Sequence, residues 1–270
     1  MRQIADVQTH YYTDPACPWS WALEPTLRRL LQELGASLEI TYVMCGMRRE
    51  LEDPEQVTLQ ALEAGAQSGM PIDVRLWLQD PPRSSHPACI AVKAAAEQGD
   101  AGPYLRRLRE GLFCRGRKLD NADALTEAAR EVGGLDLERF GIDLRSHATL
   151  EAFAADLERA QSVPAEHHAV GSDRVKLPSF EFRGAGGDVR GVYGYSDYAT
   201  LRDAALAAGG LPTADAPPSI EQALGRWGSM ATVEVASVCR LPGPLAPAEL
   251  WRLASEWRVQ AQDAGGSELW

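Results

Sequence analysis

The sequence lacks the features of a membrane-spanning, secreted or metal-binding protein. It contains no apolar run of ~18 residues, the length that a membrane-spanning helix needs. Residues 1–6 lack the apolar core of a signal peptide. The five histidines form no His-Glu-X-X-His pattern, and no carboxylates have metal-ligand spacing. We therefore expect a protein of the cytoplasm, without a membrane segment and without a metal.

Paired cysteines and positive charge are also scarce. The cysteines show no short paired spacing, which argues against a disulfide framework and indicates a reducing compartment. The formal net charge is −11, whereas nucleic acids and anionic membranes bind clusters of lysine and arginine. We therefore expect neither as a partner. The five cysteines are Cys17, Cys45, Cys89, Cys114 and Cys239.

One of these cysteines stands where a strand pattern turns into a helix pattern. Residues 7–12 predict a strand, and leucines on one face of 27–34 predict a helix, with Cys17 between them. Unpaired N–H groups and the macrodipole at a helix N-terminus favour a thiolate, whose pKa is then lowered to roughly 3.5–7.5. Pro18 suits the first helical turn. We interpret Cys17 as a reactive thiol; the alternative is a buried structural cysteine.

The position three residues after Cys17 holds Ser20 and not a second cysteine. Cys17 therefore cannot close a disulfide within its own loop. The Ser20 hydroxyl is placed either to donate a hydrogen bond to the Cys17 thiolate or to bond the local backbone only, and both interpretations stay open.

Residues 1–46 predict a β-α-β unit. Gly35 suits the left-handed position after a helix, and a second strand follows over 38–44. Two strands joined by a helix are parallel with a right-handed crossover, so both ends lie at one sheet edge. Cys45 in the turn after the second strand is therefore the candidate second thiol near Cys17. The alternative is a small apolar residue packed in a loop.

A helical block separates this unit from two further strands. Asp53 and Pro54 mark the start of a helix, and the pattern stays helical to about 161, with helices expected at 87–98, 103–112, 121–132 and 147–161. Strands over 175–182 and 189–193 form a predicted hairpin, followed by a helix to 208. Pro178 is either an edge proline or a cis-proline.

This order, with Cys-Pro-Trp at the helix mouth and Leu177-Pro178-Ser179-Phe180 opening the second half, resembles the DsbA-type thiol-disulfide oxidoreductases. More narrowly it is similar to their cytosolic FrnE-type branch. The resemblance covers roughly 5–210, including 85–88 and 112–125 in the helical block. It implies an α/β, thioredoxin-like fold formed by 1–50 and 175–211, with an all-helical insertion over 51–174.

The resemblance also implies roles for the site residues. Cys17 would be the nucleophile, Pro18 and Trp19 would shape its loop, and Leu177 would offer backbone hydrogen bonds to substrate. Pro178 would be the cis-proline that faces Cys17. The implied activity is thiol-disulfide oxidoreductase or isomerase chemistry through a mixed disulfide with protein thiols, protein disulfides or glutathione as thiol co-substrate. No other cofactor is implied.

Ser20 departs from this family, whose redox-active members mostly carry a resolving cysteine there. A monothiol can still form mixed disulfides, because an external thiol completes the exchange. Related branches imply two alternatives. One is a glutathione-dependent transferase or isomerase of the kappa type, and the other is a non-catalytic adaptor that hands a client to a protease.

Residues 212–270 form a separate C-terminal module. After a linker over 215–218, the sequence predicts short helices at 220–227, 233–239 and 247–257 and a hairpin within 259–270, an order that resembles a winged helix. Seven acidic residues against four arginines and no lysine argue against DNA binding. We expect a packing or partner-binding module. Its tryptophans are either its core or an interface: Trp227, Trp251, Trp257 and Trp270.

Overall fold

The computed structural model describes residues 7–50, 53–212 and 216–270. Two sequence predictions fall outside these ranges. One concerns the absence of a signal peptide at residues 1–6, and the other concerns Asp215, the first residue of the linker. None of the helices in the described ranges is long and apolar enough to cross a membrane.

A four-stranded sheet carries the fold. Its order is β2 (Leu38–Met44), β1 (Val7–Thr13), β3 (Ser179–Gly184) and β4 (Val189–Tyr193). β1 and β2 are parallel, and the other neighbours are antiparallel. The predicted β-α-β unit and hairpin of a thioredoxin-like α/β fold are therefore confirmed.

The third strand begins later than the sequence indicates. We expected it to start at residue 175, but β3 starts at Ser179. Pro178 has no N–H group to donate to a strand ladder, so pairing begins only after it. Val175 instead forms an isolated bridge with His168.

The single helix expected between β1 and β2 is two helices. α1 (Pro18–Ala22) ends at Leu23, and α2 (Glu24–Leu34) begins at once, with Pro25 in its first turn. Proline lacks the N–H group that would continue the ladder of α1, which explains the break. The expectation for Gly35 is also wrong, because this residue has φ −57° and begins a 3₁₀ turn, η1 (Gly35–Ser37).

One face of the sheet packs against α2 and α10 (Tyr198–Ala207). The rings of Tyr11 and Phe180 on neighbouring strands stack there, with centroids 4.4 Å apart. Leucines of α2 close this core, because they recur on one face of the helix. The buried members on the two helices are Leu27, Leu30, Leu34, Leu201 and Ala205.

The insertion between β2 and β3 is helical, as expected. Its helices are α3 (Pro54–Ser68), α4 (Arg75–Gln79), α5 (His86–Ala96), α6 (Gly102–Cys114), α7 (Ala122–Val132), α8 (Leu137–Asp143) and α9 (His147–Ser162), with a 3₁₀ turn, η2 (Ala165–His167), after them. Asp53 and Asn121 cap α3 and α7 through their side chains. α4 and α8 escape sequence prediction because they are too short to show a helical period.

The C-terminal module has the predicted order of elements. It contains α11 (Ile220–Trp227), α12 (Thr232–Val238), α13 (Leu245–Ser255) and a two-stranded hairpin of β5 (Gln262–Asp263) and β6 (Glu268–Leu269). Trp270 is buried in its core, and Trp227 packs partly against it. Trp251 and Trp257 are 54% and 95% exposed. The tryptophans therefore divide between core and surface.

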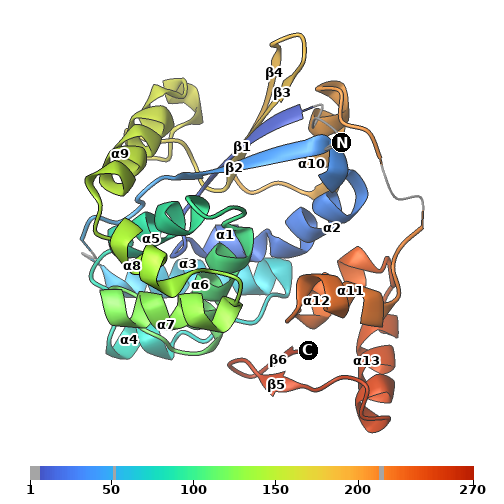
Figure 1. The fold of residues 1–270 in the computed structure, drawn as a ribbon. Helices are drawn as coiled ribbons and strands as arrows, with labels where there is room; N and C mark the ends of the chain where they lie inside the picture. The colour runs from blue at the N-terminus through green and yellow to red at the C-terminus, as the bar shows by residue number, and fades with distance from the viewer. Residues whose placement is uncertain (1–6, 51–52, 213–215) are drawn as a thin grey trace.

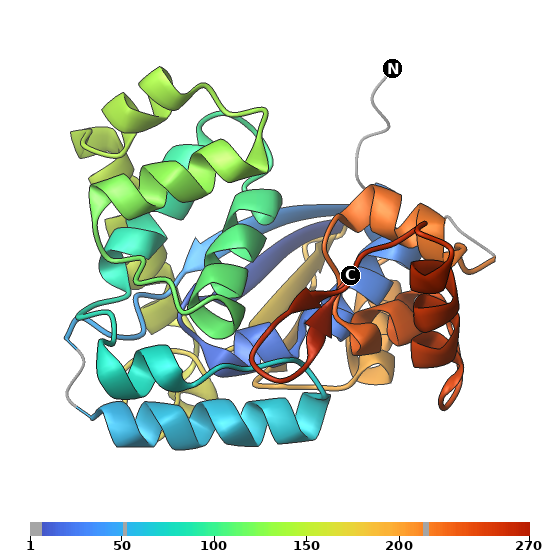
Figure 2. The same cartoon turned by 90° about the horizontal axis from the view of Figure 1, so that it is seen from below.

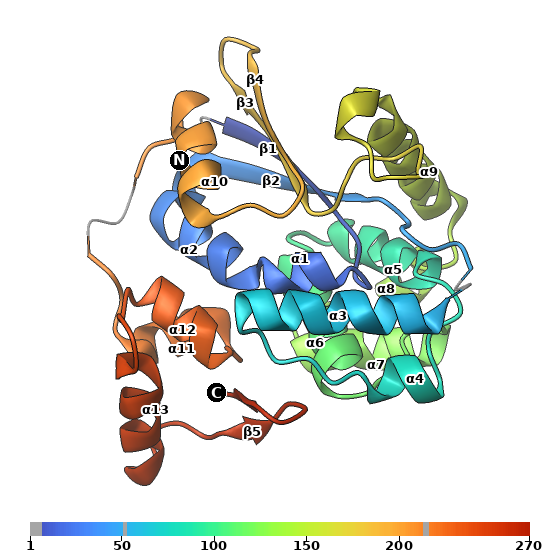
Figure 3. The ribbon, with the colours of Figure 1, turned by 180° about the vertical axis from the view of Figure 1, so that it is seen from behind.

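Most helices of the insertion lie beside the C-terminal module beneath the sheet, and α9 lies next to β2 (Figure 1). The view from below separates the two, with α1 and α2 near the middle (Figure 2). The view from behind places α12 next to α2, and these two helices are in contact (Figure 3). Three parts of the chain therefore meet around the start of α2.

Candidate functional site

Cys17 and Cys45 follow the ends of two neighbouring parallel strands. Thr13, the last residue of β1, is the register partner of Met44, the last residue of β2. Both cysteines line one cavity of about 580 Å³. The expectation that they lie at the same edge of the sheet is confirmed.

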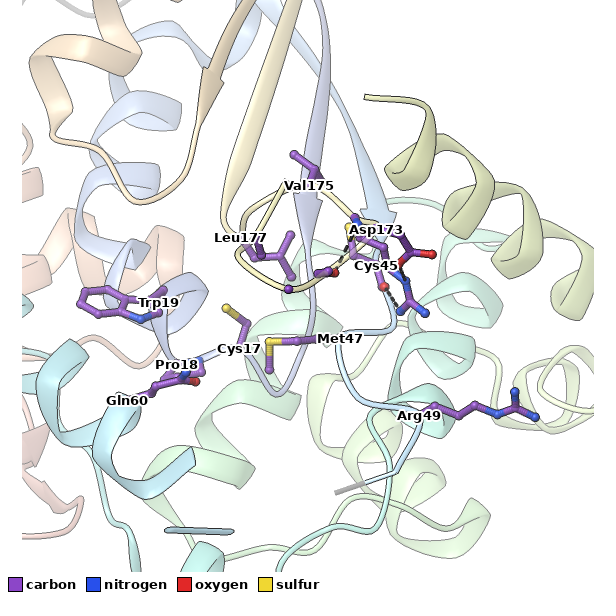
Figure 4. Close-up of a pocket in the computed structure, with 14 residues that line it drawn as sticks. Cys17, Pro18, Trp19, Cys45, Met47, Arg49, Gln60, Asp173, Val175 and Leu177 are labelled. Atoms are coloured by element: carbon purple, nitrogen blue, oxygen red, sulfur yellow. Dashed lines mark hydrogen bonds and ion pairs between the residues drawn. The ribbon is translucent and has the colours of Figure 1, made fainter. Parts of the chain in front are cut away.

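We call this cavity the thiol pocket. Most of the residues predicted for the site line it. Figure 4 shows the Cys17 sulfur pointing toward Leu177, while Cys45 is drawn beside Asp173 on another part of the wall. The other two predicted residues, Ser20 and Pro178, are buried and do not line the pocket. The predicted residues that line it are Cys17, Pro18, Trp19, Cys45 and Leu177.

The Cys17 thiol caps α1 but is not activated in this conformation. Its Sγ accepts a hydrogen bond from the Ser20 N–H at 3.4 Å, with Pro18 at the first helical position. The residue is only 2% exposed, and burial raises the pKa of Cys17 against the lowering effect of Ser20. The prediction of a lowered pKa is wrong here, because removal of water from the sulfur outweighs the favourable contacts at the start of a five-residue helix.

The Ser20 side chain points to Cys17 and to β1. Its Oγ accepts a hydrogen bond from Thr13 Oγ1 at 2.9 Å, and the Ser20 side chain acts on Cys17 so as to lower the pKa of that thiol. A direct hydrogen bond from the hydroxyl to the thiolate stays a prediction.

The loop before β3 forms the wall opposite α1. The peptide bond between Leu177 and Pro178 is cis, so the cis interpretation of Pro178 agrees with the structure. Leu177 is half-buried and lines the thiol pocket. Trp19 packs its ring against Tyr195, with centroids 5.2 Å apart. These contacts fix the apolar side of the pocket.

Cys45 shares the pocket, but its thiol is held in the interior. It is 1% exposed, and its Sγ donates to the Val43 carbonyl at 3.4 Å. Burial raises the pKa of Cys45 well above its usual value. Both Cys17 and Cys45 are free thiols in this structure. A role for Cys45 in resolving a mixed disulfide of Cys17 stays a prediction.

Sequence reasoning gave no role to Asp14, which organises the loops around the pocket. Its carboxylate is fully buried and accepts from the Ala16 N–H at 2.8 Å, the Met47 N–H at 2.6 Å and the Ser85 hydroxyl at 2.7 Å. It thereby joins the loops after β1 and β2 to the start of α5. An acidic residue directly after a buried strand was the available signal. Its negative charge also raises the pKa of Cys17 and Cys45.

Arg174 is a second residue without a sequence signal. Its Nη1 donates to the Cys45 carbonyl at 3.0 Å and to the Gly46 carbonyl, so it holds the loop after β2 against the segment before β3. Among the described residues, no three histidine, cysteine, aspartate or glutamate side chains are grouped so as to hold a metal ion. The pocket is therefore lined by two free thiols, by Leu177 and by charged side chains that include Arg174, a set suited to sulfur chemistry or to a bound peptide.

Comparison with known proteins agrees with this architecture. A sequence-family model described as "Thioredoxin" matches residues 10–168. The match begins within β1 and includes Cys17 and the helices from α1 to α9.

Two curated relatives align over nearly the whole chain, and both are named "ClpXP adapter protein SpxH". The relative from Shouchella clausii is 30% identical over 94% of this chain and 85% of its own. The relative from Halalkalibacterium halodurans is 28% identical over 98% of this chain and 88% of its own.

A solved structure with the same fold is the cytosolic disulfide reductase DsbM from Pseudomonas aeruginosa. It has a TM-score of 0.55 at 20% identity and covers 68% of this chain and 88% of its own. At this identity the likeness concerns the fold. With the matching model, the relatives and this fold, the chain belongs to the thioredoxin family and has the architecture of its DsbA-type members.

Proposed function

We propose that this protein is a protein-binding adaptor that presents client proteins to a ClpXP-type protease. The observation that carries the proposal is the extent of the likeness to proteins of that name, which reaches 98% of the chain. Nearly all of the C-terminal module must lie within that alignment. We therefore propose that the thioredoxin-like part and the C-terminal module bind partners as a single unit.

Three features support an adaptor over a dithiol enzyme. Ser20 occupies the place of a resolving cysteine, and Cys17 is buried with a raised pKa. The C-terminal module also keeps Trp251 and Trp257 exposed, and tryptophan is enriched at protein interfaces. We propose a cytoplasmic location, the one that the name of DsbM gives for that protein.

The test has two stages and uses the full chain. Proteins captured from a bacterial lysate by the immobilised chain are identified and purified, and their degradation by purified ClpXP is timed with and without the chain. We expect the chain to accelerate degradation of a client. The double variant Trp251→Ala and Trp257→Ala should reduce this effect, while Trp19→Ala serves as a comparison at the thiol pocket. No acceleration of any captured protein would refute the proposal.

The thiol pocket favours a second candidate function, the reduction of protein disulfides through a single cysteine. The Cys17 thiolate attacks a protein disulfide, which forms a mixed disulfide and releases the other protein sulfur as a thiolate. One glutathione thiolate then attacks the Cys17 sulfur and frees the reduced protein. A second glutathione attacks its glutathionyl sulfur, which returns Cys17 and forms glutathione disulfide; the two glutathione protons pass to the protein thiols.

The pocket supports this candidate because Cys17 faces Leu177, the residue to which the family resemblance assigns substrate hydrogen bonds. A second DsbM structure is named as a complex with GSH; it has a TM-score of 0.51 at 21% identity and covers 64% of this chain and 85% of its own. Glutathione is therefore the proposed co-substrate.

Mass spectrometry after exposure to glutathione disulfide tests this second candidate. We expect one glutathionyl group on Cys17 and none on that position in Cys17→Ser. The variant Ser20→Cys should gain reductase activity on insulin, because it restores a resolving thiol. No adduct on Cys17 would exclude the exchange. Noncovalent glutathione binding by Cys17→Ser would instead indicate the kappa-type transferase or isomerase.

A further inference from the structure

A cluster of buried charges lies where the three parts of the chain meet. Two of its members come from α2, three from α6 of the insertion and one from α12 of the C-terminal module. Every side chain in it is at most 10% exposed. We call these residues the ionic cluster: Glu24, Arg28, Arg106, Arg109, Glu110 and Glu234.

Arg106 joins the C-terminal module to the rest of the cluster. Its guanidinium donates to both carboxylate oxygens of Glu234, at 2.8 and 2.9 Å. The same side chain reaches Glu24 at 3.3 Å and Glu110 at 2.9 Å. A bidentate contact of this kind holds the guanidinium in one orientation and also balances its charge. Glu234 therefore helps to set where Arg106 and Glu24 lie.

Arg109 continues the contacts from the cluster toward Cys17. Its Nη1 donates to Glu24 at 2.5 Å, and its Nη2 donates to Thr13 Oγ1. Thr13 Oγ1 in turn donates to Ser20 Oγ at 2.9 Å. Ser20 donates its N–H to Cys17 Sγ at 3.4 Å, and its side chain acts on the same sulfur to lower the pKa of the thiol.

These hydrogen bonds run in one direction. The guanidinium has no acceptor, so Thr13 Oγ1 accepts from Arg109 and uses its own proton for Ser20. Ser20 Oγ then accepts from Thr13 and has its proton available for sulfur. A series of donors that begins at a cation and ends at Cys17 favours a negative charge on that sulfur.

We propose that Arg109 and Thr13 are positioning residues that orient the Ser20 hydroxyl toward Cys17, and that Glu234 of the C-terminal module steadies this arrangement through Arg106 and Glu24. The module then sets the reactivity of a thiol in another part of the chain. This inference rests neither on adaptor activity nor on disulfide reduction, because the reactivity of a thiol is measured without a partner.

Other ionisable groups also act on Cys17 and must be considered in the test. Asp14 disfavours its thiolate, whereas Arg109 favours it. Tyr11, Cys45 and Arg48 interact electrostatically with Cys17 as well. The variants below therefore leave all of these groups in place.

The first test is a double-mutant cycle on the rate at which Cys17 reacts with iodoacetamide at pH ~8, below the pKa expected for this buried thiol. Thr13→Val removes the middle hydroxyl with little change of shape. We expect it to slow alkylation about tenfold, the change that one pKa unit produces. In a Ser20→Ala background the same substitution should have no effect, because the acceptor of Thr13 is gone.

Thr9→Val is the matched control. Thr9 lies on the same strand, is 1% exposed, and its hydroxyl has no hydrogen-bond partner in the described part of the chain. It should leave the alkylation rate unchanged. Equal slowing by Thr9→Val, or equal slowing by Thr13→Val in both backgrounds, would overturn the proposal. Thermal unfolding of each variant verifies that the rates are those of folded protein.

The second test concerns the module. Glu234→Gln weakens the hold on Arg106, which then competes with Arg109 for Glu24, so we expect alkylation about threefold slower. Glu221→Gln, in a surface pair with Arg258 on the same module, is the control and should have no effect. Faster alkylation in Glu234→Gln would show that Glu234 acts through its charge alone, and an unchanged rate would show no coupling; either result would overturn the role of the module.

Discussion

The thiol pocket and the ionic cluster both contain buried ionisable groups, but the pKa shifts in the two regions have opposite effects. The pocket favours the neutral form of its thiol, and the cluster favours the charged form of a carboxylate. In the pocket, Cys17 accepts a hydrogen bond from the Ser20 N–H, and burial raises its pKa although Ser20 lowers it. In the cluster, burial alone would raise the pKa of Glu24, but Arg109, Arg106 and Arg28 outweigh it and the pKa is lowered. The buried ion pairs of the cluster therefore join the three parts of the chain, while burial of Cys17 favours the protonated thiol.

The largest effect that separates the two regions is expected from Arg106→Met. It leaves the buried carboxylates of Glu24, Glu110 and Glu234 with only two of the cluster's three arginines, and so with one net negative charge. The free energy of unfolding should therefore fall by about 3–5 kcal/mol. Urea unfolding measures the change. Arg130→Gln in the insertion is the control; its side chain is 57% exposed in a surface pair with Glu127, so its loss should amount to less than about 1 kcal/mol. Similar losses for the two variants would contradict a special role of the cluster.

Acid should weaken the cluster before it affects the pocket. Because the folded-state pKa of Glu24 is lowered, its contribution to stability is complete above the unfolded value of about 4.3 and is lost as the pH falls through the folded pKa. The Glu24→Gln variant should therefore lose less stability than the wild type between pH ~5 and ~3. Urea unfolding across this range provides the measurement, and parallel curves for the two proteins would be inconsistent with the assigned pKa.

The pocket should respond to alkali instead. Since the folded-state pKa of Cys17 is raised, its thiol should react slowly with iodoacetamide at neutral pH and faster only as the pH rises above the usual ~8.5. The unfolded chain in urea is the control and should react with the ordinary profile. A native thiol that titrates near ~8.5 would contradict the raised pKa, and one that titrates below this value would show that the pocket activates Cys17.

Local features of the fold could be predicted from the sequence, and the contacts between distant segments could not. The end of β1, the proline after Cys17 and the cap at Asp53 depend on neighbouring residues, and the structure agrees with each. The pKa of Cys17 depends on burial by segments far along the chain. Arg106 and Glu234 are 128 positions apart in the sequence, and no local sequence pattern predicts their contact.

The smallest effect on stability is expected at the surface of the module. Trp257 is 95% exposed, so Trp257→Ala should change the free energy of unfolding by no more than about 0.5 kcal/mol. Trp270→Ala, in the core of the same module, should cost about 3–5 kcal/mol. Thermal or urea unfolding compares them. A large loss for Trp257→Ala would show that this side chain is structural and would remove it from the proposed binding surface.

The central claim is that the protein binds and delivers clients without using its thiol. The most direct measurement compares the rate of client degradation by purified ClpXP in the presence of wild type and of Cys17→Ser. We predict equal acceleration by the two proteins, because binding does not need a covalent bond to Cys17. Acceleration that disappears in Cys17→Ser, while the variant remains folded, would contradict the account and place thiol chemistry at the centre of the function.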